Sequence, residues 1–597
     1  METYGEDPYL TGTLGMAVVR GLQGPDDSPV RKAHACAKHY AVHSGPESSR
    51  HSFDAVVSER DLRETYLPAF KDLVPKAKVE EVMTAYNSFR GMPCGANDYL
   101  MNGILRGEWN FKGIVISDCS AVGDFYKPRH HGTVKTATEA AALAVKTGID
   151  TECGKVYRHI PEAVEQGLLS EKDIDRNLGR LLKARYKLGE MDDLDPWSYL
   201  PDDIVEGPEH KALSLKMSKE SFVLLQNKDD ILPLAAGTRI AVVGPNADDE
   251  VMMWGNYNAI PESTITLLEG LKAKCSEVKY VRGCGLVGAE YKSKDCDYDI
   301  ADIFEPTLDI ADVLNQLEGY DTVIFAGGIS PRLEGEEMSV LLPGFSGGDR
   351  TDIELPQVQR TLIGQLHLAG KKVILINFSG SAIGLVPETE TCDAILQVWY
   401  PGQEGGTALA EILTGKVNPS GKLPITLEKR WEDNPCFDSY YCKKDDNGIR
   451  RVRYTEGIFV GYRGYDKAGT EVAYPFGYGL SYTSFEYSDI KAEVTGKQEV
   501  TVSFNVTNTG KLSGKEVCQV YVSDPECSVL RPAKELKGFE KVELGKGETR
   551  RVSIVLGSEA FHYFDVKSHE FVVEPGEFVI SVGGSSADLP LKTSVTL

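Results

Sequence analysis

Residues 113–119 read Gly-Ile-Val-Ile-Ser-Asp-Cys, a short apolar run that ends in a carboxylate. Such a run is typical of a strand buried on both faces of a parallel sheet. Further runs of this kind lie at residues 33–42, 81–86 and 147–151. Amphipathic helical patterns alternate with them, at residues 59–74, 99–109, 137–146 and 172–188. Strand and helix in alternation predict a parallel sheet covered by helices.

Polar residues follow several of these predicted strands. They are Lys38 and His39, then Tyr86 and Asn87, and then Asp118. Functional residues at the carboxyl ends of parallel strands are typical of an α/β barrel. A complete barrel needs about 250 residues. Only four or five β/α units are recognisable in residues 1–195, so either this domain is not a barrel or part of the barrel lies outside the sequence.

The remaining chain divides into four zones. Residues 196–237 are interpreted as a linker with a helix at 211–225, and residues 433–483 as a connecting segment. A second α/β domain at 238–432 has predicted strands at 239–243, 322–326, 372–377 and 394–399 and helices at 357–368 and 406–413. In residues 484–597, apolar and polar residues alternate in short runs. These runs predict strands at 499–506, 516–522, 549–555, 570–573 and 577–582. That last pattern predicts an all-β sandwich.

Charge and motif content exclude several classes of function. The 597 residues include 65 basic and 89 acidic side chains, which give a formal net charge of −24. A charge this negative argues against nucleic acid or an anionic membrane as the main partner. No apolar window reaches 18 residues, so no membrane-spanning helix is expected. The twelve cysteines contain no CxxC pair and the chain has no HExxH motif, which argues against a structural zinc site.

Asp118 is the first candidate for chemistry. A carboxylate at the end of a buried strand faces the mouth of the fold, where it could act as a nucleophile or a base. The alternative is that Asp118 caps the following helix. Lys38 and His39 could hold sugar hydroxyls or a phosphate, or they could be an ordinary ion pair and a satisfied histidine. Arg50 and His51 follow in the next loop.

The acidic loop at residues 333–337 is the second candidate. Glu334, Glu336 and Glu337 place three carboxylates within four positions, directly after a predicted strand of the second domain. Mutual repulsion favours the protonated form that a general acid needs. The alternative is a solvated acidic loop.

Nine motifs, in order along essentially the whole chain, resemble those of glycoside hydrolase family 3, and most closely its bacterial β-xylosidases. Two of them are Glu-Thr-Tyr-Gly-Glu-Asp-Pro-Tyr-Leu at residues 2–10 and Ile-Ser-Asp-Cys within residues 115–119. The others lie at residues 37–40, 43–51, 83–87, 148–154, 400–406, 420–424 and 475–481. Members of this family have a (β/α)8 barrel, an α/β sandwich and often a fibronectin type III-like domain. The resemblance therefore implies a partial barrel, an α/β sandwich and a fibronectin type III-like β-sandwich.

The resemblance also implies a mechanism and a set of site residues. The family hydrolyses glycosides with retention, through a glycosyl-enzyme formed on one carboxylate while another acts as acid and then as base. The nucleophile is expected at Asp118 and the acid/base at Glu334, with Glu336 or Glu337 as alternatives. The residues matching the sugar subsite are Lys38, His39, Arg50, Met83 and Tyr86. No metal or organic cofactor is implied.

Two details of the resemblance favour xylose over glucose. Cys119 stands where many glucosidases of the family carry Trp, and residues 150–154 are similar to the xylosidase version. A disulfide between Cys119 and Cys153 is possible, because the strands that carry them could be neighbours. The absence of the Asp-Ser-His loop argues against the branch of N-acetylglucosaminidases. The expected activity is release of xylose from the non-reducing ends of xylo-oligosaccharides.

Family members carry a further segment before the motif at residues 2–10, which contributes the first barrel strands. We therefore expect a truncated or internally initiated product. The polar residues 1–7 contain no signal peptide, while the family implies periplasmic or secreted proteins. The expected partner is a β-linked oligosaccharide or aryl glycoside, and a homodimer is possible. Two alternatives stay open: a β-glucosidase, or an inactive carbohydrate-binding remnant.

Overall fold

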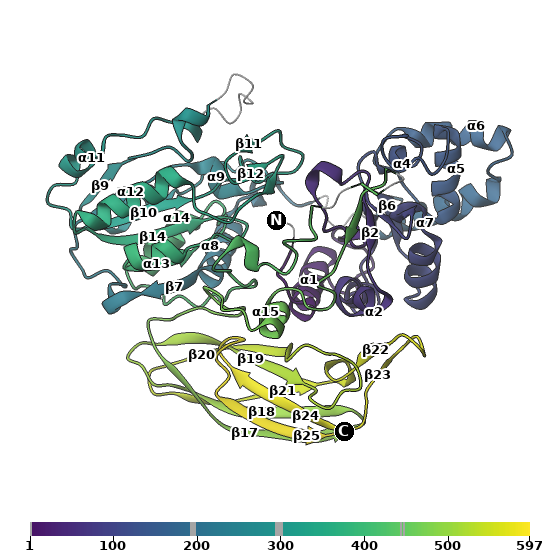
Figure 1. Ribbon diagram of the computed structural model, residues 1–597. Coiled ribbons are helices and arrows are strands. Elements are labelled where there is room, and N and C mark those ends of the chain that lie inside the picture. Colours follow the sequence, from purple (N-terminus) through teal and green to yellow (C-terminus); the bar gives the residue numbers. More distant parts are fainter. Residues whose placement is uncertain (1–2, 192–198, 293–302, 442–443, 446–447) are drawn as a thin grey trace.

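The computed structural model describes residues 3–191, 199–292, 303–441, 444–445 and 448–597, which form three lobes (Figure 1). The first and second lobes lie side by side, and the C-terminal lobe lies below both in this view. Ion pairs join the C-terminal lobe to each of the others, one from Glu559 to Lys76 of the first lobe and one from Lys515 to Glu220. The boundary expected at residue 195 lies outside the described residues.

A parallel sheet in the order β1-β3-β6 forms the centre of the first lobe. Its strands are β1 (Cys36–Tyr40), β3 (Glu81–Thr84) and β6 (Ile114–Ser117). The predicted strand at 147–151 is wrong, because α5 (Ala137–Thr147) ends only at its first residue and Thr151 alone forms a bridge, with Ile116. Within the described residues 3–191, this sheet with its bridge represents part of a barrel and not a closed ring of eight strands.

Helices pack on the face of this sheet that carries Ala37, Val82 and Val115, which confirms the α/β pattern. The helix predicted at 59–74 is divided into three parts, because Pro68 lacks a backbone N–H and begins a new helix. The parts are α2 (Glu59–Asp61), the π-helix η2 (Leu62–Tyr66) and α3 (Pro68–Leu73). The other helices are α1 (Pro8–Gln23), η4 (Tyr99–Glu108), α4 (Ala121–Asp124), α6 (Ile160–Glu165) and α7 (Glu171–Lys187).

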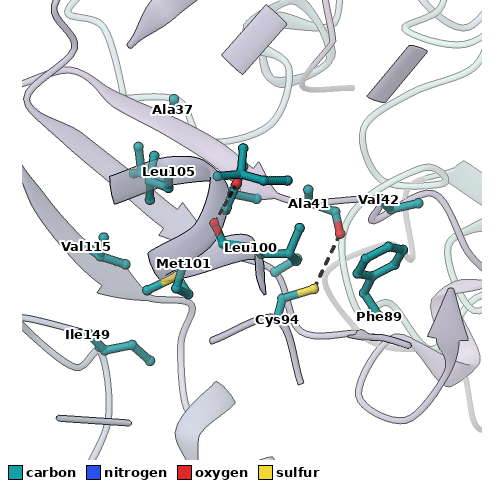
Figure 2. Packing of buried hydrophobic residues seen from close by; sticks show 14 of the residues in the cluster. Ala37, Ala41, Val42, Phe89, Cys94, Leu100, Met101, Leu105, Val115 and Ile149 are labelled. Atoms are coloured by element: carbon teal, nitrogen blue, oxygen red, sulfur yellow. Dashed lines mark hydrogen bonds between the residues drawn. The ribbon is translucent and has the colours of Figure 1, made fainter. Parts of the chain in front are cut away.

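The core of the first lobe fixes the strand that precedes Asp118. Figure 2 shows Ala37 and Val115 from the sheet near Leu100, Met101 and Leu105 from η4. Each of these side chains is at most 5% exposed. Removing a buried Leu side chain from such a core costs about 2–5 kcal/mol. The backbone at the end of β6 is therefore held by packing behind it.

The second lobe contains a six-stranded sheet in the order β7-β15-β14-β10-β8-β9. Its strands are β7 (Val223–Asn227), β8 (Ile240–Val243), β9 (Val278–Val281), β10 (Thr322–Gly328), β14 (Lys372–Phe378) and β15 (Ala394–Gln397). Its helices include α8 (Pro208–Ser221), α10 (Leu267–Lys274), α12 (Gln357–Leu368), α13 (Val386–Thr391) and α14 (Gly405–Leu413). The helix predicted at 211–225 ends early, because residues 223–227 form β7 and pair antiparallel with β15. The sheet thus includes residues that the sequence pattern assigned to a linker.

The C-terminal lobe is the expected β-sandwich. One sheet has β17 (Phe485–Gly496), β18 (Glu499–Asn508) and β21 (Thr549–Leu556). The other has β20 (Glu535–Leu544), β19 (Gly514–Ser523), β24 (Glu577–Gly583) and β25 (Leu591–Thr596). The hairpin of β22 (Tyr563–Asp565) and β23 (Glu570–Val572) lies beside them. Buried aromatic side chains, including Phe504 and Phe578, fill the space between the two sheets.

The segment at 433–483 connects the lobes by pairing with the first one. Its strand β16 (Arg451–Arg453) pairs in parallel with β2 (Asp54–Val56), which continues to β4 (Ser88–Phe89) and β5 (Met92–Pro93). Its helix α15 (Tyr462–Ala468) lies near the C-terminal lobe (Figure 1). Of the helices in the described part of the chain, none combines the length and apolar character needed to cross a bilayer.

Candidate active site

Asp118 directly follows β6 and is 8% exposed. Its Oδ1 accepts a hydrogen bond of 2.7 Å from the Cys119 N–H, and His39 Nε2 lies 3.3 Å from its Oδ2. Ser120 then adopts a left-handed conformation with φ 62°, which turns the chain sharply into α4. This turn leaves the Asp118 carboxylate at the carboxyl edge of the sheet, beside the end of β1.

Lys38 and His39 lie on β1, next to this edge. The Lys38–His39 peptide bond is cis, and Lys38 Nζ lies 5.2 Å from the centre of the Tyr257 ring. The His39 ring lies 5.3 Å from that of His43. Burial, followed by the electrostatic effect of the neighbouring His39, lowers the pKa of His43 to about 4. His43 is therefore neutral near pH 7, with Nδ1 3.0 Å from Asn87 Oδ1.

Tyr86 links Asp118 to Arg50. The Tyr86 hydroxyl donates a 2.9 Å hydrogen bond to the Cys119 carbonyl, and the Arg50 guanidinium lies 4.6 Å from the centre of the Tyr86 ring. Burial raises the pKa of Tyr86, and the nearby negative charge of Asp118 raises it further. The phenol is thus a hydrogen-bond donor beside the carboxylate at neutral pH.

Met83 has a different environment from the other expected subsite residues. It lies half-buried on β3, in register with Ile116 of β6. Its neighbour Val82 faces the core of the lobe, so Met83 lies on the opposite face of the strand. The structure places Met83 close to the strand that leads to Asp118, and Met83, like Tyr86, does not line the cavity described below.

The three carboxylates of the acidic loop have three different environments. Glu334 is 7% exposed, and its oxygens accept hydrogen bonds from the Gly380 N–H at 2.7 Å and from the Ser381 and Tyr400 hydroxyls at 2.5 Å. Glu336 is 40% exposed and forms an ion pair with Arg50. Glu337 lies 2.9 Å from His51 and is largely exposed.

The loop at residues 47–51 of the first lobe holds this acidic loop in place. Glu47 Oε1 accepts a 2.8 Å hydrogen bond from the Glu337 N–H and a 3.0 Å bond from Arg50. The Glu47 N–H in turn donates to Asp349 of the second lobe at 2.9 Å. Together with the contacts of Arg50 and His51, these bonds bring the acidic loop to the edge of the sheet that carries Asp118.

A cavity of about 1180 Å³ lies where the lobes meet. Lys38, His39 and Arg50 line it from the first lobe, while Glu334 and Glu336 line it from the second. Asp118 is not part of its wall and borders it through His39. The cavity is large enough for a sugar ring and part of an aglycone, since small-ligand sites commonly measure about 300–1,000 Å³.

Three residues of this cavity were not predicted as site residues from the sequence. Tyr400 lies just beyond β15, so its position after a strand could have marked it as a candidate. The side chain of Arg350 is 9% exposed and lies near Glu334. Burial lowers the pKa of its guanidinium, and the negative charge of Glu334 opposes that effect. Tyr257 lies in a loop, over Lys38. No strand end or periodicity marks Arg350 or Tyr257 in the sequence.

A disulfide joins Cys119 to Cys153, with Cα atoms 4.6 Å apart. The sequence left this pairing open, and the bridge between β6 and residue 151 explains it, because it makes the two segments neighbours. The Ser120 N–H also donates to the Cys153 carbonyl at 2.5 Å. The disulfide therefore fixes the loop that directly follows Asp118.

Comparison with known families agrees with this arrangement. Residues 1–184 match the glycosyl hydrolase family 3 N terminal domain, and residues 222–482 match the glycosyl hydrolase family 3 C-terminal domain. The chain belongs to glycoside hydrolase family 3. Residues 516–586 match the fibronectin type III-like domain, so the expected fold class is confirmed in all three lobes of this family 3 protein.

Relatives within family 3 include both xylosidases and glucosidases. The chain is 39% identical to a xylan 1,4-β-xylosidase from Xylanibacter ruminicola, over 99% of its own length and 82% of the relative. It is 35% identical to a β-glucosidase from Bacteroides ovatus, over 98% of its own length and 77% of that relative. A solved family 3 β-glucosidase from Bifidobacterium adolescentis superposes with a TM-score of 0.82 at 31% identity, covering 99% of this chain and 80% of that one. The chain is thus a family 3 glycoside hydrolase of the β-xylosidase and β-glucosidase group.

Proposed function

We propose that this protein is a retaining exo-β-glycosidase that releases xylose from the non-reducing ends of xylo-oligosaccharides. In the first step, Asp118 attacks the anomeric carbon as the glycosidic bond breaks, and the leaving oxygen takes a proton from the general acid. In the second step, the group that acted as general acid, now a carboxylate, removes a proton from water. That water displaces Asp118 and restores the β configuration.

We assign the acid/base role to Glu336, one of the alternatives that the sequence left open. A general acid must reach the leaving oxygen and exchange a proton with it. Both oxygens of Glu334 are already engaged by donors from Gly380, Ser381 and Tyr400. Glu336 is more exposed and is held by Arg50, which also packs on Tyr86 beside Asp118. In this proposal Glu334 anchors the loop, and Glu336 carries the proton.

The single observation that supports the reaction is that Arg50 connects the acidic loop to the surroundings of Asp118, because it pairs with Glu336 and packs on the ring of Tyr86. Lys38, His39 and Arg50 supply charged donors for sugar hydroxyls, and such donors bind more strongly as charge develops in the transition state. The proposed substrate is a β-linked oligosaccharide or an aryl glycoside.

The preference for xylose is supported by the disulfide beside Asp118. Cys119 of this disulfide stands where the resemblance places Trp in many glucosidases. The identity of 39% to the xylosidase of Xylanibacter ruminicola, against 35% to the glucosidase of Bacteroides ovatus, agrees with a preference for xylose. A β-glucosidase is the second candidate, because relatives with that name are 35% identical. A disulfide also suits an oxidising compartment. Together with the 32% identical periplasmic β-glucosidase of Salmonella typhimurium, this supports export to the periplasm or beyond.

Substrate profiling tests this proposal. We expect kcat/KM for p-nitrophenyl β-xyloside to exceed that for the β-glucoside by at least about 10-fold, a difference that one hydroxymethyl group can produce in a fitted pocket. In Asp118→Asn, kcat should fall by at least about 1,000-fold because the nucleophile is lost. A higher kcat/KM for the glucoside would favour the second candidate. Binding of xylose without turnover by folded protein would support a carbohydrate-binding remnant instead.

A further inference from the structure

A second cluster of chemically active side chains lies beside the cavity and takes no part in the proposed reaction. It consists of His51, Asp124 and His130, whose ligand atoms all lie within 4.8 Å of one another. His51 Nδ1 lies 2.7 Å from Asp124 Oδ2, and His130 Nδ1 lies 2.8 Å from Asp124 Oδ1. The two imidazoles thus face the two oxygens of one carboxylate.

Asp124 is the centre of this cluster and its side chain is only 1% exposed. A carboxylate buried to this degree needs compensating positive charge. The ammonium group of Lys127 lies 3.5 Å from Oδ1, but its side chain is 42% exposed and can turn into solvent. Both histidine side chains are 28% exposed, which leaves a path for a small ion to reach the carboxylate.

One of the imidazole nitrogens lacks a hydrogen bond. His130 Nδ1 is buried and close to Asp124, yet its approach does not have hydrogen-bond geometry. A buried nitrogen without a donor or acceptor is costly in a folded protein. A cation placed between His130 and Asp124 would satisfy the nitrogen lone pair and the carboxylate together.

His51 has the arrangement expected of a metal ligand on its far side. Its Nε2 lies 2.9 Å from the Glu337 carboxylate, while Nδ1 faces Asp124. Histidines that bind metals usually donate their second ring N–H to a carboxylate, which orients the ring and increases its basicity. Glu337 would be that second partner here.

From these contacts we propose that His51, Asp124 and His130 form a binding site for a divalent transition-metal ion of the Zn²⁺ class. Two imidazole nitrogens and one carboxylate oxygen are ligands that Zn²⁺ prefers, and a water would complete a tetrahedron. Bonds of about 2.0–2.1 Å in that geometry require ligand atoms about 3.3 Å apart. In this structure the two imidazoles contact different oxygens of Asp124, so one imidazole must move toward the oxygen that the other contacts when the ion takes the place of protons.

The site would join two lobes, because His51 lies in the loop at residues 47–51 and its partner Glu337 belongs to the acidic loop of the second lobe. An ion held there fixes the ring of His51 and, through Nε2, the position of Glu337. The proposed acid/base Glu336 directly precedes Glu337 in the chain. The ion supports this loop and takes no part in bond breaking.

Zinc titration of the intact protein tests this inference independently of any glycosidase activity. Protein stripped with EDTA and transferred to chelator-free buffer is titrated with ZnCl₂ by calorimetry, and the visible spectrum of its Co²⁺ form reports the geometry. We expect one equivalent of Zn²⁺ per chain with this site intact. His130→Ala should weaken that binding by more than about 100-fold, and Glu337→Gln by about 10–100-fold, as expected for an outer partner.

The matched control is His159→Ala, which removes a histidine that pairs with Glu162 elsewhere in the first lobe. This variant should bind Zn²⁺ as the wild type does. Free cysteines such as the exposed Cys36 can also take up Zn²⁺, so the contrast between the two histidine variants is decisive. The inference is overturned if the wild type binds no equivalent of Zn²⁺, or if His130→Ala, with an unchanged circular dichroism spectrum, binds it equally tightly.

Discussion

At the scale of single residues, Glu334 and Glu336 lie in different environments, and our proposal of Glu336 as the acid/base rests on that difference. Glu334 and Glu336 are two positions apart and of the same type, so spacing alone does not decide between them. Glu334 turns toward Gly380 and Ser381, which follow β14, whereas Glu336 meets Arg50 of the other lobe. The difference comes from packing between segments that are distant in sequence.

This assignment predicts opposite behaviour for two alanine variants. In Glu336→Ala, kcat/KM for substrates with poor leaving groups should fall by about 10²–10⁴-fold, while activated aryl glycosides lose little, because they need no proton. Azide should restore turnover of activated substrates and yield a β-glycosyl azide, since the vacated space admits an anion. Product analysis by mass spectrometry and NMR provides the measurement.

Glu334→Ala is the matched comparison for that experiment. Loss of the anchor to Gly380 and Ser381 should lower activity toward good and poor leaving groups alike, without azide rescue. Azide rescue in Glu334→Ala and none in Glu336→Ala would reverse the two roles.

At the scale of helices and strands, the sequence correctly predicted those elements whose structure is determined by their own local sequence. The run that forms β6 is apolar at each central position, and Asp118 follows it directly, so both the strand and the candidate carboxylate could be recognised. Alternation with period two likewise located β18, β19, β21 and β24 of the sandwich. The sequence did not predict β17, which is exposed and alternates weakly, nor did it predict β20, β22 and β25.

Elements that depend on distant partners were misassigned. Residues 223–227 continue the helical pattern of α8 but form β7, because an antiparallel partner in β15 is available. Residues 147–151 read as a strand, yet α5 extends through Thr147 and a left-handed Gly148 ends it. The cluster of His51, Asp124 and His130 has no recognisable spacing, since the turn into α4 brings its members together. For β7 and for this cluster the deciding contact is non-local, whereas at residues 147–151 the local end of α5 decides the structure.

At the scale of the whole molecule, the active cavity exists only if the lobes dock, and the segment at residues 5–8 contributes to that docking. Glu6 accepts hydrogen bonds from the Thr426 N–H at 2.8 Å, the Thr426 hydroxyl at 2.7 Å and the Tyr462 N–H at 2.7 Å. Asp7 accepts a 2.8 Å bond from the Tyr462 hydroxyl, which itself accepts from the Leu536 N–H at 2.9 Å. Three parts of the chain thus meet at two adjacent carboxylates.

Docking should therefore depend on pH through Glu6. Burial raises the pKa of Glu6 to about 7, and the negative charge of Glu428 adds to this, although three donors oppose it. Because the pKa in the folded state exceeds that of an unfolded Glu, near 4.3, this contribution to stability is complete below that value. It is lost as the pH rises through about 7. Wild type should become less stable between pH 5 and pH 8 by about 1–3 kcal/mol from this group.

Glu6→Gln removes the titrating carboxyl group. The melting temperature of this variant, measured by calorimetry, should therefore lose the part of its pH dependence that comes from Glu6. Glu471→Gln is the control, because Glu471 is exposed and pairs only with the exposed Lys429. If wild type and Glu6→Gln melt in parallel from pH 5 to pH 8, Glu6 does not titrate in this range and the account of docking is wrong.

The central claim, that Asp118 is the nucleophile at a site shared by two lobes, is tested most directly by trapping the glycosyl-enzyme. Incubation with 2-deoxy-2-fluoro-β-xylosyl fluoride slows both steps, and a good leaving group lets the intermediate accumulate. Peptic digestion and tandem mass spectrometry then locate the sugar. We predict one fluoroxylosyl group per chain, esterified to Asp118. A label on another carboxylate, or turnover that inverts the anomeric configuration without any label, would contradict the account.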